Sequence, residues 1–498
     1  MRAVAIALVV GYHIGAPGMS GGFIGVDVFF VISGYLITRQ LWAENERTRT
    51  IDVTGFWARR IRRLAPAATL MILAVVVAAS VVGSPLAWDE VSRAAVAASL
   101  SISNGYFGVQ SADYFAAEVS SNPLLHTWSL AVEEQFYLVW PVLLLAVAGL
   151  GGASVDHRRR RWVGAIAVVT VVSFGLGLAL TARGTPWAFY ASPARAWEFG
   201  LGAMAALVYP ARLLASDRRR TLMAGAGLAL LVLSLVLIDG STAFPGTWAL
   251  LPAAGTTLLV LAEAPALVPV LSLRPLQWIG RLSYGWYLWH WPVLVLGIAY
   301  LGPVGLPTRT LLAVAALVPA VWSYRLVERP VRHSRPLARS PRANFVMGGA
   351  LVAVVIVGVA VGGARIRDRL AEPGVQVLAA AQEDVPPLAD ASCESLDVDD
   401  LLASCLAVPP DGDRSDPILL VGDSHAGHWQ PAVEEGAVAL GRPLVTSWRG
   451  NCPAIPVAVT VEGRSSADCR SRQDGLLDLV DDLEPAAVVL SHSAAYDV

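Results

Sequence analysis

The stretch IGVDVFFVISGYLITRQL, residues 24–41, contains a single acid, Asp27, and no other charge before Arg39. An apolar run of about 20 residues can cross the hydrocarbon core of a bilayer as a helix. Similar stretches recur as far as residue 363, and only 15% of the residues are charged, whereas soluble proteins have about 25%. We therefore predict a polytopic α-helical membrane protein with eleven spans, at 2–15, 24–41, 65–83, 134–151, 162–181, 195–209, 222–238, 247–263, 284–302, 308–327 and 345–363.

The arginines gather in every second loop between these stretches, and the chain has no lysine. The rich loops are 39–63, 158–161, 212–220 and 325–342, while the loops between them have almost no arginine. Loops rich in basic residues face the cytoplasm. This pattern predicts a cytoplasmic N-terminus and an extracytoplasmic region after residue 363. The net charge of −2 averages two different faces and does not indicate nucleic-acid binding.

The chain changes character after residue 363, where apolar runs shorten and Pro, Asp and Ser become frequent. All four cysteines lie in this part, and an even number outside the cytoplasm indicates disulfides. Proximity favours Cys393–Cys405 and Cys452–Cys469, with four free thiols as the alternative. We expect a linker at 364–415 and alternating strands and helices of a parallel α/β sheet from 416 onward.

Ionisable residues inside predicted spans are the first candidates for function, because a charge at membrane depth is costly. Arg2 and His13 lie in the first span, about 16 Å apart along a helix, so they are expected to bind two parts of one long ligand or to work through intervening groups. Arg195 and Glu198 are one helical turn apart and are expected to form a buried structural pair. His290 lies in the aromatic stretch SYGWYLWHWP, and its role stays open between structure and function.

A second candidate site lies in ILLVGDSHAGHW, residues 418–429. An apolar strand, a Gly-Asp-Ser turn and a run of small residues would present Ser424 ahead of a helix. A serine hydroxyl is a weak nucleophile until a general base takes its proton. The turn therefore predicts a nucleophile whose base must be found elsewhere.

Several of these segments resemble the membrane acyltransferase-3 family in order and spacing over residues 1 to about 335. They are RAVAIALVVGYH, GGFIGVDVFFVISGYLIT, FWARRIRRLAPA, NPLLHTWSLAVEEQFYLVWP, IGRLSYGWYLWHWPVL and VERPVR. The added span and GDSHAGHW resemble the subgroup fused to an extracytoplasmic SGNH domain, which O-acetylates bacterial surface glycans. The resemblance implies ten core spans plus one, with a membrane acyltransferase domain at 1–335, a linking helix at 336–363 and a partial SGNH-hydrolase-like domain at 416–498.

The resemblance also implies roles for individual residues. Arg2 and His13 would be needed for acyl transfer, His13 as general base or as transient acyl carrier, and Glu134 would be another essential position. Ser424 would be the nucleophile of the SGNH domain, with Asp423 shaping its turn.

The basic stretch of the family falls on Arg59, Arg60 and Arg63, where guanidinium groups suit the phosphates of acetyl-CoA. Acetyl-CoA is the expected donor, and no metal or permanently bound cofactor is expected. The expected partners are the lipid bilayer and an extracytoplasmic glycan that accepts the acetyl group.

One departure from the family concerns the end of the soluble domain. An Asp-x-x-His that would supply the base and the acid for Ser424 is not found before the chain ends, so we expect these residues to lie beyond it in a truncated domain. The expected function is a multi-pass O-acetyltransferase of a bacterial plasma membrane. A membrane-tethered esterase and a multispan transporter with an outer binding domain are the alternatives.

Overall fold

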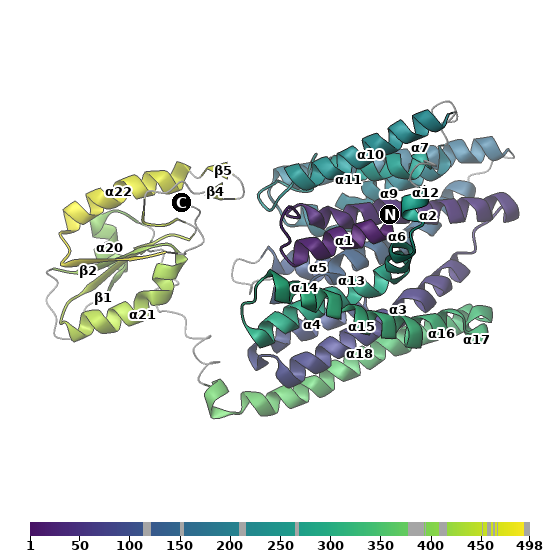
Figure 1. Ribbon diagram of the computed structural model, residues 1–498. Helices are drawn as coiled ribbons and strands as arrows, with labels where there is room; N and C mark the ends of the chain where they lie inside the picture. Colours follow the sequence, from purple (N-terminus) through teal and green to yellow (C-terminus); the bar gives the residue numbers. More distant parts are fainter. Residues whose placement is uncertain are drawn as a thin grey trace. The chain divides into compact units, whose positions relative to one another are not determined.

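A computed structural model describes most of the chain, namely residues 1–112, 121–149, 154–208, 216–263, 268–376, 393, 395–407, 416–450, 452–455, 460–461, 464–465 and 467–492. The chain divides into two compact units, Met1–Glu372 and Pro373–Val498. The first unit is helical and the second contains a sheet (Figure 1). Each unit is considered by itself.

The first unit consists of helices joined by short connections. Its elements are α1 (Arg2–His13), η1 (Gly22–Ile24), α2 (Gly25–Thr48), α3 (Val53–Val82), η2 (Pro85–Ala87), α4 (Trp88–Ser99), α5 (Ser103–Gln110), α6 (Thr127–Gly149), α7 (Val155–Ala182), α8 (Trp187–Tyr190), α9 (Ser192–Leu207), α10 (Asp217–Leu237), α11 (Leu250–Ala262), α12 (Val268–Leu271), α13 (Arg274–Leu301), α14 (Leu306–Ala315), α15 (Leu317–Trp322), η5 (Ser323–Glu328), α16 (Arg329–Arg332), α17 (Arg335–Arg339) and α18 (Pro341–Leu370).

Each of the eleven predicted spans falls on one of these helices or on a run of them. Within the described residues, seven helical segments have the length and hydropathy to cross a membrane, while α1 and α11 are apolar but shorter, with 12 and 13 residues. The helical membrane architecture is therefore confirmed, and the number of eleven spans stays a prediction.

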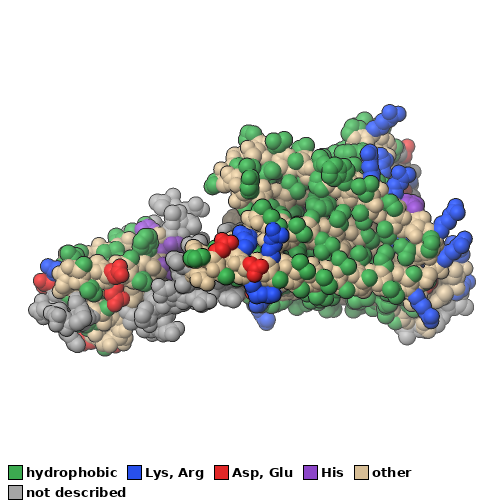
Figure 2. Space-filling view, turned by 90° about the horizontal axis from the view of Figure 1, so that it is seen from below, with side chains coloured by type: hydrophobic (Ala, Val, Ile, Leu, Met, Phe, Trp, Pro, Cys, Tyr) green, Lys and Arg blue, Asp and Glu red, His purple; other side chains and the backbone are tan. Residues whose placement is uncertain are grey.

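The outer surface of this unit is apolar. Val171 and Val172 on α7 are 71% and 65% exposed, and Val361 on α18 is 65% exposed. Figure 2 shows apolar side chains covering the flank of the unit, with many of the arginine side chains gathered at one end. An apolar outside of this extent suits lipid rather than water, so the unit is that of a multi-pass membrane protein.

Two glycines let helices α2 and α9 touch through their backbones. A Cβ atom at Gly34 would lie 2.0 Å from the carbonyl oxygen of Phe199, and one at Gly202 would lie 1.9 Å from that of Val31. Small residues allow this close approach inside membranes, where packing rather than water exclusion holds helices together. Helix α9 also packs on α7, α10 on α11, α3 on α18 and α1 on α13 (Figure 1).

A buried ion-pair network joins the same two helices. The Arg195 guanidinium of α9 lies 2.8 Å from the Asp27 carboxylate of α2 and 2.7 Å from the Glu198 carboxylate one turn along α9. All three side chains are at most 1% exposed. The predicted pair of Arg195 and Glu198 is present, and Asp27 adds a link between helices that sequence spacing could not reveal.

We expect Arg195→Met to destabilise the protein by about 3–5 kcal/mol, because it leaves two buried carboxylates without their cation. Unfolding in detergent micelles, followed by circular dichroism, measures the change. The matched control is Arg93→Met, which removes an exposed pair with Asp89 on α4 and should cost at most about 0.5 kcal/mol. Equal effects of the two substitutions would contradict a structural role for the buried network.

The second unit contains a four-stranded sheet in the order β1-β3-β2-β6. Strand β2 is parallel to both β3 and β6, with Gly422 opposite Trp448 and Ser491, while β1 is antiparallel to β3. The elements of this unit are α20 (Val398–Ser404), β1 (Leu406–Ala407), β2 (Ile418–Gly422), α21 (Ser424–Ala439), β3 (Leu444–Trp448), β4 (Thr460–Val461), β5 (Arg464–Ser465), α22 (Ala467–Leu483) and β6 (Ala487–Ser491). The α/β class predicted for this region is confirmed.

Part of the predicted linker at 364–415 belongs to the two folded units. Helix α18 continues to Leu370, and α20 and β1 lie within the interval. A disulfide between Cys393 and Cys405 holds this part, and a second joins Cys452 to Cys469, which is the pairing that proximity favours. Helix α20 has seven residues and strand β1 has two, which is too short for a periodic pattern to appear in the sequence. In the structure, the disulfide between Cys393 and Cys405 and the pairing of β1 with β3 support them.

Candidate functional site

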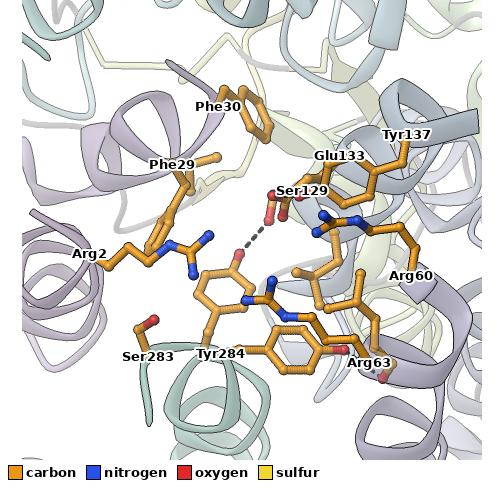
Figure 3. A pocket seen from close by; sticks show the side chains of 14 residues that line it. Arg2, Phe29, Phe30, Arg60, Arg63, Ser129, Glu133, Tyr137, Ser283 and Tyr284 are labelled. Carbon is orange, nitrogen blue, oxygen red and sulfur yellow. Dashed lines mark hydrogen bonds between the residues drawn. The ribbon is translucent and has the colours of Figure 1, made fainter. Parts of the chain in front are cut away.

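A cavity between α1, α2, α3, α6 and α13 collects basic side chains from segments far apart in the sequence. Figure 3 shows the guanidinium groups of Arg2, Arg60 and Arg63 directed toward the same space, beside Glu133 and Tyr284. The full lining is Arg2, Val26, Phe29, Phe30, Arg60, Arg63, Leu64, Ser129, Leu130, Glu133, Tyr137, Ser283, Tyr284 and Tyr287.

The three arginines of this cavity, hereafter the arginine cavity, differ in how well they are paired. Arg60 donates to Gln40 Oε1 at 3.2 Å, and its guanidinium lies 5.2 Å from the ring centre of Tyr137. Arg2 and Arg63 have neither a hydrogen bond nor an ion pair within the described part of the chain.

One carboxylate, that of Glu133, lines the arginine cavity beside the three guanidinium groups. It accepts hydrogen bonds from the hydroxyls of Ser33 and Tyr137. The cavity therefore has an excess of positive charge, and planar guanidinium groups without partners suit a ligand that bears phosphate or carboxylate.

Two residues that the resemblance assigned to the site lie outside the arginine cavity. Arg59 faces Glu44, 3.7 Å away, and is 41% exposed. Glu134 accepts a hydrogen bond from Ser101 and lines a separate cavity along α18, which it shares with Arg60. The neighbouring Glu133, not Glu134, is the acid that lies with Arg2.

A second cavity, of about 350 Å³, lies at the opposite end of α1 and is walled mainly by aromatic rings. We call it the histidine cavity, because His13 and His126 line it. Its other lining residues are Val9, Tyr12, Phe23, Val26, Leu125, Trp128, Phe189, Tyr190, Asp239, Gly240, Thr242, Phe244, Tyr287 and Trp291.

His13 has a hydrogen-bonding partner that the sequence did not identify. Its Nδ1 lies 2.9 Å from Nε2 of His290, which is 277 residues away. The third histidine, His126, contacts the carbonyl oxygen of Leu288 through Nε2 at 3.1 Å, and its buried Nδ1 has no partner in the described part. Sequence reasoning left the role of His290 open and missed His126, although the two histidines lie within conspicuous aromatic segments.

The arginine and histidine cavities have two lining residues in common, Val26 and Tyr287. The Tyr287 hydroxyl is held between Ser129 Oγ at 2.5 Å and the carbonyl oxygen of His126 at 3.0 Å. The two cavities therefore adjoin, with an aliphatic and a phenolic side chain between them.

In the second unit, Ser424 occupies the position predicted for a nucleophile. It is the first residue of α21, separated from β2 by Asp423, and is partly exposed. Asp423 caps the helix by accepting from the backbone N–H of His425 at 2.8 Å. A Cβ atom at Gly422 would lie 1.7 Å from the Ser491 carbonyl oxygen, so only glycine allows the turn to pass so close to β6.

A general base for Ser424 is not found among the described residues. The nearby imidazole of His425 contacts the Asp423 carboxylate at 3.2 Å instead, and no hydrogen bond joins Ser424 to a histidine in the described part. The expectation that base and acid lie beyond the chain end stays a prediction.

Helix α3, which carries Arg60 and Arg63, has a side-chain cap at its first turn. The Asp52 carboxylate accepts from the backbone N–H of Gly55 at 2.9 Å and from Thr54 Oγ1 at 3.0 Å. The Gly55 N–H favours the ionised form and holds the pKa of Asp52 below its ordinary value of 3.8. This cap lies at the N-terminal end of α3, about three turns before Arg63.

We expect Asp52→Ala to lower stability by about 1 kcal/mol, because a backbone donor loses its partner. A pKa that is lower in the folded than in the unfolded state adds stability that is fully present above about pH 4 and is lost as the pH falls through the folded value. The difference between wild type and Asp52→Ala in detergent melting curves should therefore shrink below pH 4. A difference that stays constant down to pH 2 would contradict the charged cap.

The architecture and the two cavities define a multi-pass membrane protein that carries a serine turn on a separate α/β unit. Residues 1–325 match the family described as an acyltransferase domain, and residues 370–497 match the SGNH domain that is fused to AT3 domains. The chain belongs to the membrane acyltransferase-3 family with an attached SGNH domain, so the resemblance is confirmed.

Two relatives illustrate this membership. The peptidoglycan O-acetyltransferase OatA of Listeria monocytogenes is 33% identical over 354 residues, which cover 67% of this chain and 55% of the relative. The O-acetyltransferase OatA of Staphylococcus aureus strain NCTC 8325 is 32% identical over 348 residues, which cover 67% of this chain and 56% of the relative. The chain thus spans about half the length of the curated relatives it matches. No solved structure matches it.

Proposed function

We propose that this chain is an O-acetyltransferase that moves an acetyl group from acetyl-CoA across the plasma membrane to a hydroxyl of a cell-wall glycan. The observation that carries the proposal is the arrangement along α1. The guanidinium groups of Arg2 and Arg63, which have no partner among the described residues, lie in one cavity, His13 lies in an adjoining cavity, and Val26 and Tyr287 line both. This arrangement suits a ligand with an anionic end and a reactive end some distance apart.

Acetyl-CoA has this form. Its phosphates would bind Arg2, Arg60 and Arg63, at the end that the arginine-rich loops favour as cytoplasmic. Its extended pantetheine arm would run toward His13, which lies about 16 Å along α1 from Arg2. The thioester would then lie at the histidine cavity, where an acceptor from the other side of the membrane could meet it.

The acceptor class is proposed from the relatives, one of which is named as a peptidoglycan O-acetyltransferase. An attacking hydroxyl oxygen would form a bond to the acetyl carbon while the carbon–sulfur bond breaks. Its proton would pass to His13 and from there to the departing thiolate. With His13 as acyl carrier instead, the imidazole nitrogen would make the first attack.

Ser424 would act in a later transfer on the extracytoplasmic side. Its hydroxyl would take the acetyl group and pass it to a sugar hydroxyl, once a base is supplied. Backbone N–H groups at the start of α21 would stabilise the negative oxygen that forms during attack, in competition with the hydrogen bonds that the His425 and Ala426 N–H groups donate to Asp423.

The arginine cavity predicts which members of the basic stretch bind the donor. Arg2→Gln and Arg63→Gln should each weaken coenzyme A binding by about 10- to 100-fold, since each removes a charge-assisted hydrogen bond worth about 1.5–3 kcal/mol. Arg59→Gln is the matched control, because Arg59 faces Glu44 outside the cavity, and it should leave the affinity within about twofold. Isothermal titration of the full chain in detergent measures the three dissociation constants.

The opposite order, with Arg59→Gln harmful and Arg63→Gln neutral, would place the phosphates outside the arginine cavity. Equal and small effects of all three substitutions would contradict coenzyme A as the ligand. All three titrations are made at low salt, because ions in solution screen the attraction between charges, and they screen exposed charges more than enclosed ones.

Transfer itself is measured with inside-out membrane vesicles that receive acetyl-labelled coenzyme A on their exposed face. We expect label to leave coenzyme A in the wild type, and the rate to fall by about 100-fold or more in His13→Ala, because general acid–base catalysis contributes at least that factor. Ser424→Ala should still consume the donor but should not deliver label to glycan. Full activity of His13→Ala would remove His13 from the mechanism, and an intact donor in every sample would reject the acyltransferase proposal in favour of a transporter or an esterase.

A further inference from the structure

The orientation of His290 determines which of its nitrogens carries the proton. Its Nδ1 lies 2.7 Å from the carbonyl oxygen of Tyr287 and 3.1 Å from that of Trp286. Carbonyl oxygens only accept hydrogen bonds, so Nδ1 must be the donor. A neutral imidazole has a single N–H, and Nε2 of His290 is therefore left with a lone pair.

This assignment passes to His13 through their mutual contact. Nδ1 of His13 lies 2.9 Å from Nε2 of His290. Since Nε2 has only a lone pair to offer, Nδ1 of His13 must carry the proton and donate it. In a neutral His13 ring, Nε2 is then the nitrogen with the free lone pair.

The surroundings leave this lone pair available. The His13 ring lines the histidine cavity, and in the described part of the chain no hydrogen bond reaches its Nε2. The ring lies nearly parallel to that of His290, at a centroid distance of 5.1 Å and an interplanar angle of 23°, and its centroid is 4.5 Å from that of Trp291. Packing on both rings restricts rotation that would exchange the two nitrogens.

The third histidine near the pair does not compete for these protons. His126 uses Nε2 for the Leu288 carbonyl oxygen, so its proton is committed elsewhere. In the described residues, neither His13 nor His290 forms an ion pair. The orienting partner of His13 is thus a neutral imidazole, where many enzymes use a carboxylate for the same task.

We propose that His290 is a positioning residue that holds His13 as the Nδ1–H tautomer and makes Nε2 the atom that reacts at the histidine cavity. The inference rests on the proposed function and deepens it. As a base, Nε2 takes the proton of the attacking hydroxyl while oxygen bonds to the acetyl carbon, and it then returns that proton to the thiolate released from the carbon–sulfur bond. The positive charge that forms on His13 in between is stabilised through Nδ1–H by the lone pair of His290.

The tautomer can be observed without any turnover. Nitrogen-15 solid-state spectra of the histidine-labelled full chain in lipid bilayers separate protonated from unprotonated ring nitrogens, and loss of signals in His13→Ala identifies those of His13. We expect the wild type to show His13 protonated at Nδ1. A wild-type His13 protonated at Nε2 overturns the proposal.

Two substitutions at His290 then test its role. His290→Phe keeps a ring of similar size but removes the acceptor, so the Nδ1–H preference should be lost and kcat should fall about 100-fold, with the KM for acetyl-CoA unchanged because the arginine cavity is intact. His290→Gln retains an amide oxygen as acceptor and should recover about tenfold of that loss. His333→Phe is the control, because His333 is exposed and its ring forms a hydrogen bond with the Arg329 carbonyl oxygen away from His13, and it should behave as wild type.

The outcomes separate this inference from the proposed function. Wild-type kcat in His290→Phe overturns the positioning role, as does a loss that appears only in KM. If His290→Phe does not fold, as judged by its melting curve, the wild-type spectrum and His290→Gln decide the matter. If the wild-type spectrum is as expected but acetyl-CoA is not consumed, the donor in the proposed function is wrong, while the tautomer assignment stands.

Discussion

The contact of Arg195 with Asp27 and Glu198 is the constraint on which the membrane unit depends. A charge inside a bilayer must be neutralised within the protein, because no water is there to solvate it. Four aromatic rings, those of Phe30, Trp128, Phe189 and Phe244, surround this guanidinium at 5.5–6.0 Å. Three of these rings also wall the histidine cavity and the fourth lines the arginine cavity. The ion pair thus fixes α2 against α9 and, through the rings, shapes both cavities.

The same rule makes exceptions informative. Arg2 and Arg63 are only partly buried, they have no such partner in the described residues, and the cavity that they line is the place where a ligand would supply it. Arg59 and Arg60 are adjacent in sequence but lie about 100° apart around α3, so one turns to Glu44 and the other to Tyr137. A basic stretch in a sequence can therefore divide into a part that faces a cavity and a part that pairs at the surface.

Much of the fold could be predicted from the sequence, because apolar runs of bilayer length, a pair one helical turn apart and a strand–turn pattern are local signals. The eleven helical regions, the Arg195–Glu198 pair and the turn at Ser424 are of this kind. The candidate site was harder to predict from the sequence. Which of Glu133 and Glu134 faces Arg2 depends on how α6 is rotated against its neighbours, and the contact between His13 and His290 joins residues 277 positions apart. Tertiary packing makes such contacts, and the spacing of residues along the sequence does not indicate them.

The side chains shared by the two cavities have a consequence for the energetics of the cell. Val26 and the hydrogen-bonded Tyr287 line both cavities, and their side chains stand where an open path along α1 would join the two. A protein that opened such a path would leak protons and dissipate the electrochemical gradient of its membrane. In the proposed transfer, a separation of this kind would let a small neutral group pass from one cavity to the other while the insulation against ions is kept. Under the proposed function, transfer of an acyl group across a bilayer would need no channel, as long as donor and acceptor can each reach the shared side chains from their own side.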